Sequence, residues 1–480
     1  MPDLDILIEQ GLVMTMDPQR KIVTDGAVAI KGNQIVEIGR TEDLKGKYPN
    51  PKRVIGAKNK LVMPGLINTH VHLNIQAPKG IRPGNYGYGY PFLQRFHDII
   101  ASPYWTAELE YVQSAVSCIE MIKNGTTSIV DLGTPVGLEE MEVELIKESG
   151  LRAVLSPETM DIFEGPGYYI EQDKRKSLGS TQDNIDRVEQ FIKKHHKSAG
   201  GRINIWPSIW TMVTTSDDLV KGLKKLADKY DVGMEVHASF MRDMTEKTVQ
   251  LWGKGDAERL ADLGALDHRT LIAHGGNLNG REVGLIRDAQ ASICHVIFSS
   301  MILAYGAAIW GRFPQWHKMG INVSLGTDDQ CVCNHMDVFR VMNATYLVHK
   351  EIQFNNNLWP PQAILEMATL NGAKSMLMER EIGSLEAGKK ADIILIDLMR
   401  PEWVPWHRYN LIENLVLSAT GDSVDTTIVD GQILMEGRQI KTLNERKLLE
   451  EEQSRVGELV ESLSFCSPER PYPENMPPLW

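Results

Sequence analysis

Residues 61–72 read Leu61-Val62-Met63-Pro64-Gly65-Leu66-Ile67-Asn68-Thr69-His70-Val71-His72. An apolar run reaches Pro-Gly, resumes for two residues and ends in two histidines with one residue between them. Alternate side chains of a strand share a face, so His70 and His72 are predicted to point the same way and to bind one metal ion. A bare His-x-His is more often a pair of unrelated surface or core histidines. Its place at a strand end, with further candidates downstream, favours the metal site.

Downstream of this stretch, β-rich and helical segments alternate, which is typical of βα units around a parallel sheet. Eight β-rich segments with helical intervals predict an α/β fold, a TIM-like (β/α)8 barrel. These segments are Leu66–Thr69, Thr126–Val130, Arg152–Leu155, Ile203–Trp206, Gly233–Val236, Thr270–Ala273, Ala291–Cys294 and Ile321–Leu325.

Both ends of the chain are also β-rich, and neither end can bury a core alone. We therefore predict one small β-sandwich made from residues 1–60 together with 380–440. The barrel, residues 61–379, is inserted between these two parts. Residues 441–480 are predicted to form a charged helix followed by a Pro-rich arm.

Polar residues follow the predicted barrel strands where this fold carries its chemistry, at the carboxyl ends. His70 and His72 end the first strand, His237 the fifth and His274 the sixth, and Asp328 follows the eighth. A lone His after an apolar run is usually structural, and a lone Asp after Gly-Thr is usually a helix cap. Five such residues at four strand ends are much harder to obtain by accident.

This pattern resembles the metal-dependent amidohydrolase superfamily, in particular the branch with atrazine chlorohydrolase, melamine deaminase and related N-heterocycle hydrolases. The likeness covers nearly the whole chain. Its motifs are residues 64–72, Ala273-His274, Gly326-Thr327-Asp328, and the stretches 366–373 and 382–392 that return to the β-sandwich. The resemblance implies that His70, His72, His237 and Asp328 bind one divalent metal, and that His274 is a further ligand or holds the attacking water.

The chemistry of these residue types agrees with that ligand set. Imidazole and carboxylate suit zinc and also iron or cobalt, so the ligand set alone does not choose the metal, although zinc is expected. Asp328 is expected to take a proton from the attacking water, and His274 to orient that water or polarise the substrate. Two-metal members of the superfamily often carry a carboxylated lysine late in the fourth strand. Residues 203–210 contain no lysine, so we expect one metal.

Two positions depart from the family. Deaminase-like members have a glutamate three residues after the fifth-strand histidine, whereas this chain has Phe240, which cannot carry a proton. Glu235 shares a strand face with His237, so it is either a substitute catalytic acid or a buried structural carboxylate. The seventh-strand stretch 295–300 also differs, so substrate contacts there cannot be carried over. Phe240 is expected to bind substrate. The aromatic loop after His72 either covers a flat substrate, offering Tyr90, Phe92, Phe96 and His97, or is a surface loop packed on a neighbouring subunit.

Net charge and cysteine count indicate which binding partners and which cellular compartment to expect. The net charge is -12 without a block of like charge, which argues against nucleic acid or an anionic membrane surface as partner. Five cysteines are few and odd in number, and no signal peptide or membrane span is apparent, so a cytoplasmic protein is expected. An apolar arm ending in Pro477-Pro478-Leu479-Trp480 predicts a homo-oligomer, or an arm folded on its own barrel.

The leading hypothesis is a metal-dependent hydrolase of a small aromatic or heteroaromatic molecule. It would cleave a C–N bond of amide, urea or carbamate type, or a ring C–X bond, because Phe240 removes the acid that ring deamination normally uses. The alternative is an aminohydrolase, a deaminase of a nucleobase-like or triazine ring. A non-catalytic scaffold is a remote alternative, since decayed ligands would be expected there and all five are present.

Overall fold

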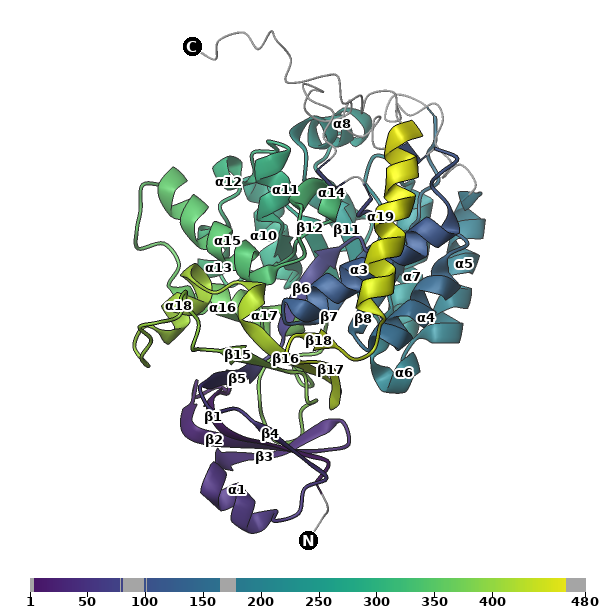
Figure 1. The fold of residues 1–480 in the computed structure, drawn as a ribbon. Coiled ribbons are helices and arrows are strands. Elements are labelled where there is room, and N and C mark those ends of the chain that lie inside the picture. The colour runs from purple at the N-terminus through teal and green to yellow at the C-terminus, as the bar shows by residue number, and fades with distance from the viewer. Residues whose placement is uncertain (1–3, 78, 81–98, 101, 165–177, 463–480) are drawn as a thin grey trace, which may run out of the picture.

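The structure is a computed structural model, and it describes residues 4–77, 79–80, 99–100, 102–164 and 178–462. Its two parts are a sheet formed by both ends of the chain and a barrel surrounded by helices (Figure 1). No helix among these residues is long and apolar enough to cross a membrane.

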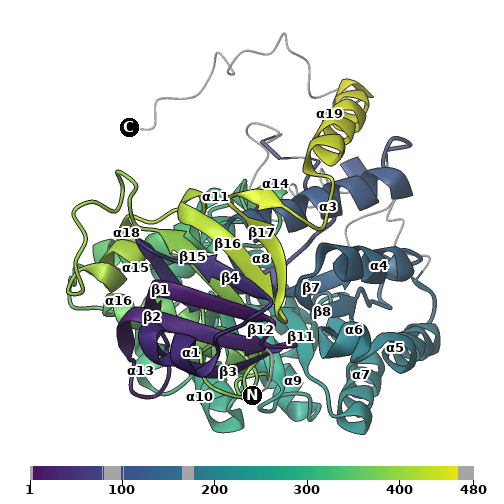
Figure 2. The same ribbon diagram turned by 60° about the horizontal axis from the view of Figure 1, so that its bottom comes forward.

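The terminal strands form one continuous sheet, seen from below in Figure 2. Its strands are β1 (Ile6–Met14), β2 (Ile22–Lys31), β3 (Gln34–Arg40), β4 (Arg53–Gly56), β5 (Lys60–Pro64), β15 (Ile393–Asp397), β16 (Val424–Val429), β17 (Gln432–Glu436) and β18 (Gln439–Ile440). Among the described residues the order is β18-β17-β16-β15-β5-β1-β2-β3, with β4 beside β1. β5 pairs antiparallel with β15, so the strands of both chain ends, which were predicted to form one small β-sandwich together, belong to one continuous sheet. The predicted boundary at residue 61 falls inside β5.

The barrel strands follow in chain order. They are β6 (Leu66–Val71), β7 (Thr126–Thr134), β8 (Arg152–Pro157), β9 (Ile203–Ile205), β10 (Ser208–Ile209), β11 (Met234–Ala238), β12 (Thr270–His274), β13 (Ser292–His295) and β14 (Asn322–Leu325). Neighbours pair in parallel as β6-β7-β8-β9 and β10-β11-β12-β13-β14. Hydrogen bonds close the ring between β14 and β6, including one from the Asp328 amide to the His70 carbonyl at 3.0 Å. The predicted barrel class is confirmed.

Helices cover the outside of the barrel (Figure 1). They are α3 (Ala107–Lys123), α4 (Glu139–Ser149), α5 (Thr181–His195), α6 (Ser198–Gly201), α7 (Asp217–Tyr230), α8 (Arg242–Trp252), α9 (Asp256–Asp262), α10 (Gly280–Ala289), α11 (Ile297–Ile302), α12 (Ala307–Trp310), α13 (Phe313–Lys318), α14 (Gln330–Cys333), α15 (Val338–Ile352), α16 (Pro361–Met367), α17 (Leu370–Ser375), α18 (Leu411–Leu417) and α19 (Glu445–Ser462), while α1 (Thr41–Lys47) lies on the sheet. In α7, Leu219, Leu223 and Leu226 are buried at helical spacing, so one face packs on the barrel.

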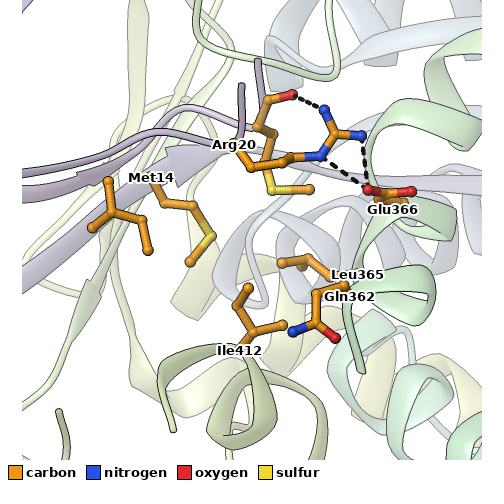
Figure 3. A pocket seen from close by; sticks show the side chains of 8 residues that line it. Met14, Arg20, Gln362, Leu365, Glu366 and Ile412 are labelled. Atoms are coloured by element: carbon orange, nitrogen blue, oxygen red, sulfur yellow. Dashed lines mark hydrogen bonds and ion pairs between the residues drawn. The ribbon is translucent and has the colours of Figure 1, made fainter. Parts of the chain in front are cut away.

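The sheet meets the amino ends of the barrel strands, and a small cavity of about 60 Å³ lies at this junction (Figure 3). Met14 and Ile22 line it from the sheet, and Leu365 and Ile412 from α16 and α18. Arg20 closes its edge through an ion pair with Glu366 at 2.7 Å. The sheet therefore covers the amino end of the barrel, and the carboxyl end carries the candidate site.

A buried arginine fastens the sheet to the barrel. Arg152, the first residue of β8, is fully buried and donates to Asp392 at 2.7 and 3.0 Å and to Asp430 at 3.1 Å. Burial opposes its charge, but the two carboxylates outweigh burial and raise its pKa. The guanidinium thus holds two acidic residues of the terminal sheet against the barrel.

We predict that Arg152→Met lowers the free energy of unfolding by about 3 kcal/mol, because two carboxylates lose the charge that compensates their burial. Urea denaturation followed by circular dichroism measures the change. Arg446→Met is the control, since the side chain of Arg446 is 89% exposed on α19. A loss below about 1 kcal/mol, the size expected of a surface pair, would contradict this role.

Candidate active site

Five polar side chains meet at the carboxyl ends of the barrel strands. His70 and His72 come from the end of β6, His237 from β11, His274 from the end of β12, and Asp328 follows β14. Each is at most 6% exposed. The sequence analysis predicted these residues, and the structure brings all of them together.

The backbone at two of these positions is unusual. His274 has φ +72° and Asp328 has φ +73°, in the left-handed region that residues with a Cβ rarely adopt. Such conformations cost roughly 1–3 kcal/mol each and cluster at functional sites, where the surrounding structure holds them. Here they turn the two side chains toward the histidines at the barrel mouth: the His70 and His274 ring centroids lie 5.1 Å apart.

Three histidines are held by the ring nitrogen that faces away from the centre. Nδ1 of His237 donates to the Trp210 carbonyl at 2.7 Å, and Nδ1 of His72 donates to the Leu132 carbonyl. Nδ1 of His70 contacts a carboxylate oxygen of Glu235 at 2.9 Å. Partners of this kind orient the imidazoles that bind a metal and fix which nitrogen carries the proton.

The inward-facing nitrogens fit a cation. Nε2 of His72 and Nε2 of His237 lie 3.2 Å apart. Since both rings donate from Nδ1, both neutral rings present bare lone pairs there, and these repel unless a cation lies beside them. Nε2 of His70 is buried without a hydrogen-bond partner among the described residues. A metal ion bound at this nitrogen would satisfy it.

Two sets of potential ligands share His70. One is His70, His72 and His237, and the other is His70, His274 and Asp328, with the ligand atoms of each set within 4.8 Å of one another. Burial, followed by the neighbouring imidazoles, lowers the pKa of His70 and of His237 well below the usual value. Both rings are therefore neutral near pH 7 and free to coordinate. The residues fit one divalent metal, with imidazole and carboxylate ligands that suit zinc.

Asp328 faces two histidines. Its carboxylate oxygens lie 3.6 Å from Nε2 of His72 and 3.8 Å from Nε2 of His274. The Asp329 amide donates to it at 2.8 Å, which fixes the carboxylate. Burial lowers the pKa of His274 to about 4, against the opposing charge of Asp328. This arrangement suits a carboxylate that accepts a proton and a neutral imidazole that orients a water or a substrate.

Glu235 lies one layer deeper than the ligands, as its position on the strand predicted. Its side chain is fully buried, and burial raises its pKa well above the usual value. One Glu235 oxygen contacts Nδ1 of His70, which is the ring nitrogen on the far side from the inward-facing Nε2. This contact favours the orienting role over that of substitute acid, and a catalytic role for Glu235 stays a prediction.

Aromatic side chains surround the histidines. The Phe240 ring lies 5.2 Å from His274 and 5.9 Å from His237, centroid to centroid, so it borders the centre as expected of a substrate-binding residue. Trp210, which follows β10, lies 5.1 Å from His237. Tyr305, between α11 and α12, lies 5.7 Å from Phe240. The other predicted substrate contacts, Tyr90, Phe92, Phe96 and His97, lie outside the described residues.

Trp210 and Tyr305 were not predicted from the sequence. Trp210 is the last residue of the fourth-strand segment 203–210, which was considered only for a metal-binding lysine. Its position at the end of a barrel strand could have marked it as a residue of the site. Tyr305 lies ten residues beyond His295, in a stretch that departs from the family, and no motif marks it.

Comparison with protein families matches residues 61–434 to the model described as "Amidohydrolase family". The chain is 30% identical over 465 residues to the 5-methylthioadenosine/S-adenosylhomocysteine deaminase of Thermoanaerobacter pseudethanolicus, covering 95% of this chain and 100% of that protein. It is 32% identical over 464 residues to the 5'-deoxyadenosine deaminase of Methanosarcina mazei, covering 95% and 98%.

Solved structures show the same architecture. An adenosine deaminase from Xanthomonas campestris with bound zinc aligns with a TM-score of 0.85 at 22% identity, covering 96% of this chain and 99% of that one. Atrazine chlorohydrolase from Arthrobacter aurescens TC1, complexed with zinc, aligns with a TM-score of 0.84 at 20% identity, covering 94% and 100%. At these identities the likeness concerns the fold, and it confirms the predicted barrel with a sheet from both chain ends.

Proposed function

Because this chain belongs to the amidohydrolase family, we propose that it is an aminohydrolase that releases ammonia from the adenine ring of a purine nucleoside. The family and the buried ligand cluster make it a metal-dependent hydrolase. The finer proposal is supported by relatives at about 30% identity, matched over nearly their full length, that are named deaminases of adenosine derivatives. This support reverses the order of the two hypotheses from the sequence, in which cleavage of an amide, urea or carbamate came first.

One observation on this chain carries the chemistry: the Nε2 atoms of His72 and His237 converge at 3.2 Å beside the carboxylate of Asp328. A metal bound there, zinc by ligand preference, would lower the pKa of a water to roughly 7. Asp328 would accept a proton from the attacking water, and His274 would orient that water or the ring. The water oxygen bonds to the ring carbon that carries the amino group, the C–N bond breaks, and the proton on Asp328 leaves with the amine as ammonia.

The aromatic side chains suit a flat ring. Phe240 and Tyr305 meet edge to face at 5.7 Å beside His274, and together they border the centre with apolar surface. A purine stacked on such a surface gains contact area while its amino-bearing carbon faces Asp328.

Cleavage of an amide, urea or carbamate is the second candidate, and Phe240 is the observation that favours it. A ring aminohydrolase must protonate a poor leaving group and usually a ring nitrogen, and no carboxylate stands three residues after His237. A tetrahedral carbonyl adduct collapses with less help from an acid.

A substrate panel separates the two candidates. The expected result is ammonia release from 5'-deoxyadenosine, methylthioadenosine or S-adenosylhomocysteine, with a matching change in the ultraviolet spectrum of the purine. Aryl amides, ureas and carbamates, guanine, cytosine and melamine are run beside them. Amine release from the carbonyl compounds without ammonia from any nucleoside would overturn deamination in favour of the second candidate.

The role of Phe240 gives a sharper prediction. We expect Phe240→Glu to raise kcat/KM for nucleoside deamination about tenfold or more, because positioned acids contribute roughly 10²- to 10⁴-fold to proton transfer. Phe240→Gln is the matched control, with the same shape and no ionisable proton, and it should give no gain. An equal effect of both variants would contradict a missing acid at this position.

A further inference from the structure

The segment directly after His72 is held by side chains of α3. Gln113 accepts hydrogen bonds from the amides of Gln76 and Ala77, both at 2.9 Å. Ser117 donates to the Leu73 carbonyl at 3.0 Å. These bonds fix residues 73–77, so the direction of His72 at the strand end depends on how this segment is held.

One side chain of that segment joins it to the other ligand-bearing loop. The Gln76 side-chain carbonyl accepts from Gln330 at 3.1 Å, and it lies 3.0 Å from the Ser117 hydroxyl, whose single hydrogen is shared between this oxygen and the Leu73 carbonyl. Gln330 begins α14, two residues after Asp328, and is fully buried. The segments that follow His72 and Asp328 are thus linked through one amide group.

The same amide reaches the C-terminal helix. The Gln76 side-chain nitrogen donates to Glu452 on α19 at 3.3 Å. α19 packs along α3 (Figure 1), and Glu452 is only 8% exposed. Gln76 has one side-chain carbonyl and one side-chain amide, and both are used: the first toward α3 and α14, the second toward α19.

We propose that Glu452 is a positioning residue of the active site: from the C-terminal helix it holds the Gln76 side chain, and thereby the segments that follow His72 and Asp328. Its accepting oxygen fixes the Gln76 amide in the orientation that links these segments. The proposal extends the active-site framework to an element remote from the barrel strands. It does not depend on which substrate the enzyme uses.

The charges around Glu452 add a dependence on pH. Burial raises its pKa to about 8, helped by Glu120 on α3 and opposed by Lys79 in the loop. Lys79 and Glu120 also lie 3.6 Å apart as an ion pair. The folded state therefore binds the Glu452 proton more tightly than the unfolded state, and this contribution to stability falls as pH rises from the usual glutamate range to about 8. Above that pH the carboxylate is ionised, and the cost of keeping this charge buried favours opening of the contact with Gln76.

The test compares Glu452→Ala with Glu452→Gln, which keeps an accepting oxygen. Hydrogen exchange is measured on peptides covering residues 73–77 and 328–333, with the rate of zinc removal by a chelator and kcat/KM on the active nucleoside. In Glu452→Ala we expect exchange about tenfold faster in both peptides, faster zinc loss, and a fall of about tenfold in kcat/KM, the range of a lost buried hydrogen bond. Glu452→Gln should match the wild type at pH 7.

Glu450→Ala is the control on the same helix, because the Glu450 side chain is 66% exposed and forms an ion pair with Arg446 one turn away. It should change none of the three measurements. Wild-type exchange in Glu452→Ala, or equal damage in Glu452→Gln, would overturn the proposal. A wild type inactive on nucleosides would instead count against the proposed substrate, since exchange and zinc removal need no turnover.

A second experiment measures the pH dependence of hydrogen exchange in the wild type and in Glu452→Gln, which keeps the shape of the side chain. Exchange in the same two peptides, corrected for the intrinsic rate, should rise in the wild type between pH 7 and 9 and stay constant in Glu452→Gln. An identical pH response in both proteins would overturn the role of the Glu452 proton.

Discussion

Asp328→Asn is expected to lower kcat by about 10³-fold, or roughly 4 kcal/mol, while leaving the fold intact. Asp328 lies beside His72 and His274, and it is the carboxylate that we propose takes the proton of the attacking water. Asparagine keeps the shape and one accepting oxygen for the Asp329 amide, but it cannot accept the proton. It also tolerates the left-handed backbone at this position better than most residues.

The matched control is Asp231→Asn. Asp231 also has a left-handed backbone, φ +51°, but its side chain is 95% exposed and it precedes the amino end of β11, whereas His237 lies near the carboxyl end of that strand. Steady-state assays report the rate, and circular dichroism with thermal melting reports the fold. Activity of Asp328→Asn within about tenfold of the wild type would remove Asp328 from the role of base.

The barrel could be predicted because its strands are short, apolar and separated by helical segments. The candidate metal ligands could be predicted because all parallel strands of a barrel have their carboxyl ends on the same side. Residues that end different strands therefore lie close together there, however far apart they are in sequence. The shared sheet followed from a different argument: the β-rich ends had no core of their own. In the structure, β5 and β15 pair over their full length, and Ile8, Val28 and Ile393 lie in one buried cluster.

The groups that orient the candidate metal ligands through hydrogen bonds could not be predicted. Backbone carbonyls of Leu132 and Trp210 hold His72 and His237, and a carbonyl carries no signal in the residue type. Glu235 was placed on the correct strand face, but whether its carboxylate meets substrate or His70 depends on side-chain direction. Tyr305 reaches the site through a loop whose path no periodicity describes.

The contact between Glu452 and Gln76 has one counterpart in the sequence, which is the position of Glu452 within the apolar stripe of the C-terminal helix. Leu448, Val456 and Leu459 are apolar positions of the predicted charged helix, and in the structure they pack into buried clusters. Glu452 lies four residues from Leu448 and from Val456, on the same face. A carboxylate within an apolar stripe needs a partner, but nothing in the sequence could name Gln76, which lies 376 residues away.

His237→Ala is expected to abolish tight metal binding, from about one divalent ion per chain to less than about a tenth, and to reduce turnover at least as strongly as Asp328→Asn. Without this ring, His72 loses the partner nitrogen at 3.2 Å, and the first ligand set keeps only two members. Elemental analysis of the purified protein measures the metal. The wild type should also melt at a lower temperature after a chelator, because an ion bound only by the folded state stabilises it.

The control for this experiment is His295→Ala at the end of β13. His295 is as buried as the ligands and ends a barrel strand, but its Nε2 contacts His349 at 3.0 Å and its ring stacks on Phe313, so it lies outside both ligand sets. Its loss should reduce stability and leave the metal in the folded protein. Full metal content in His237→Ala, metal loss in both variants, or two ions per active chain would contradict a single site built on His70, His72, His237 and Asp328. The contrast isolates what separates the two strand-end histidines: His237 shares its centre with the ligand atoms of both His70 and His72, whereas Nε2 of His295 faces the single imidazole of His349.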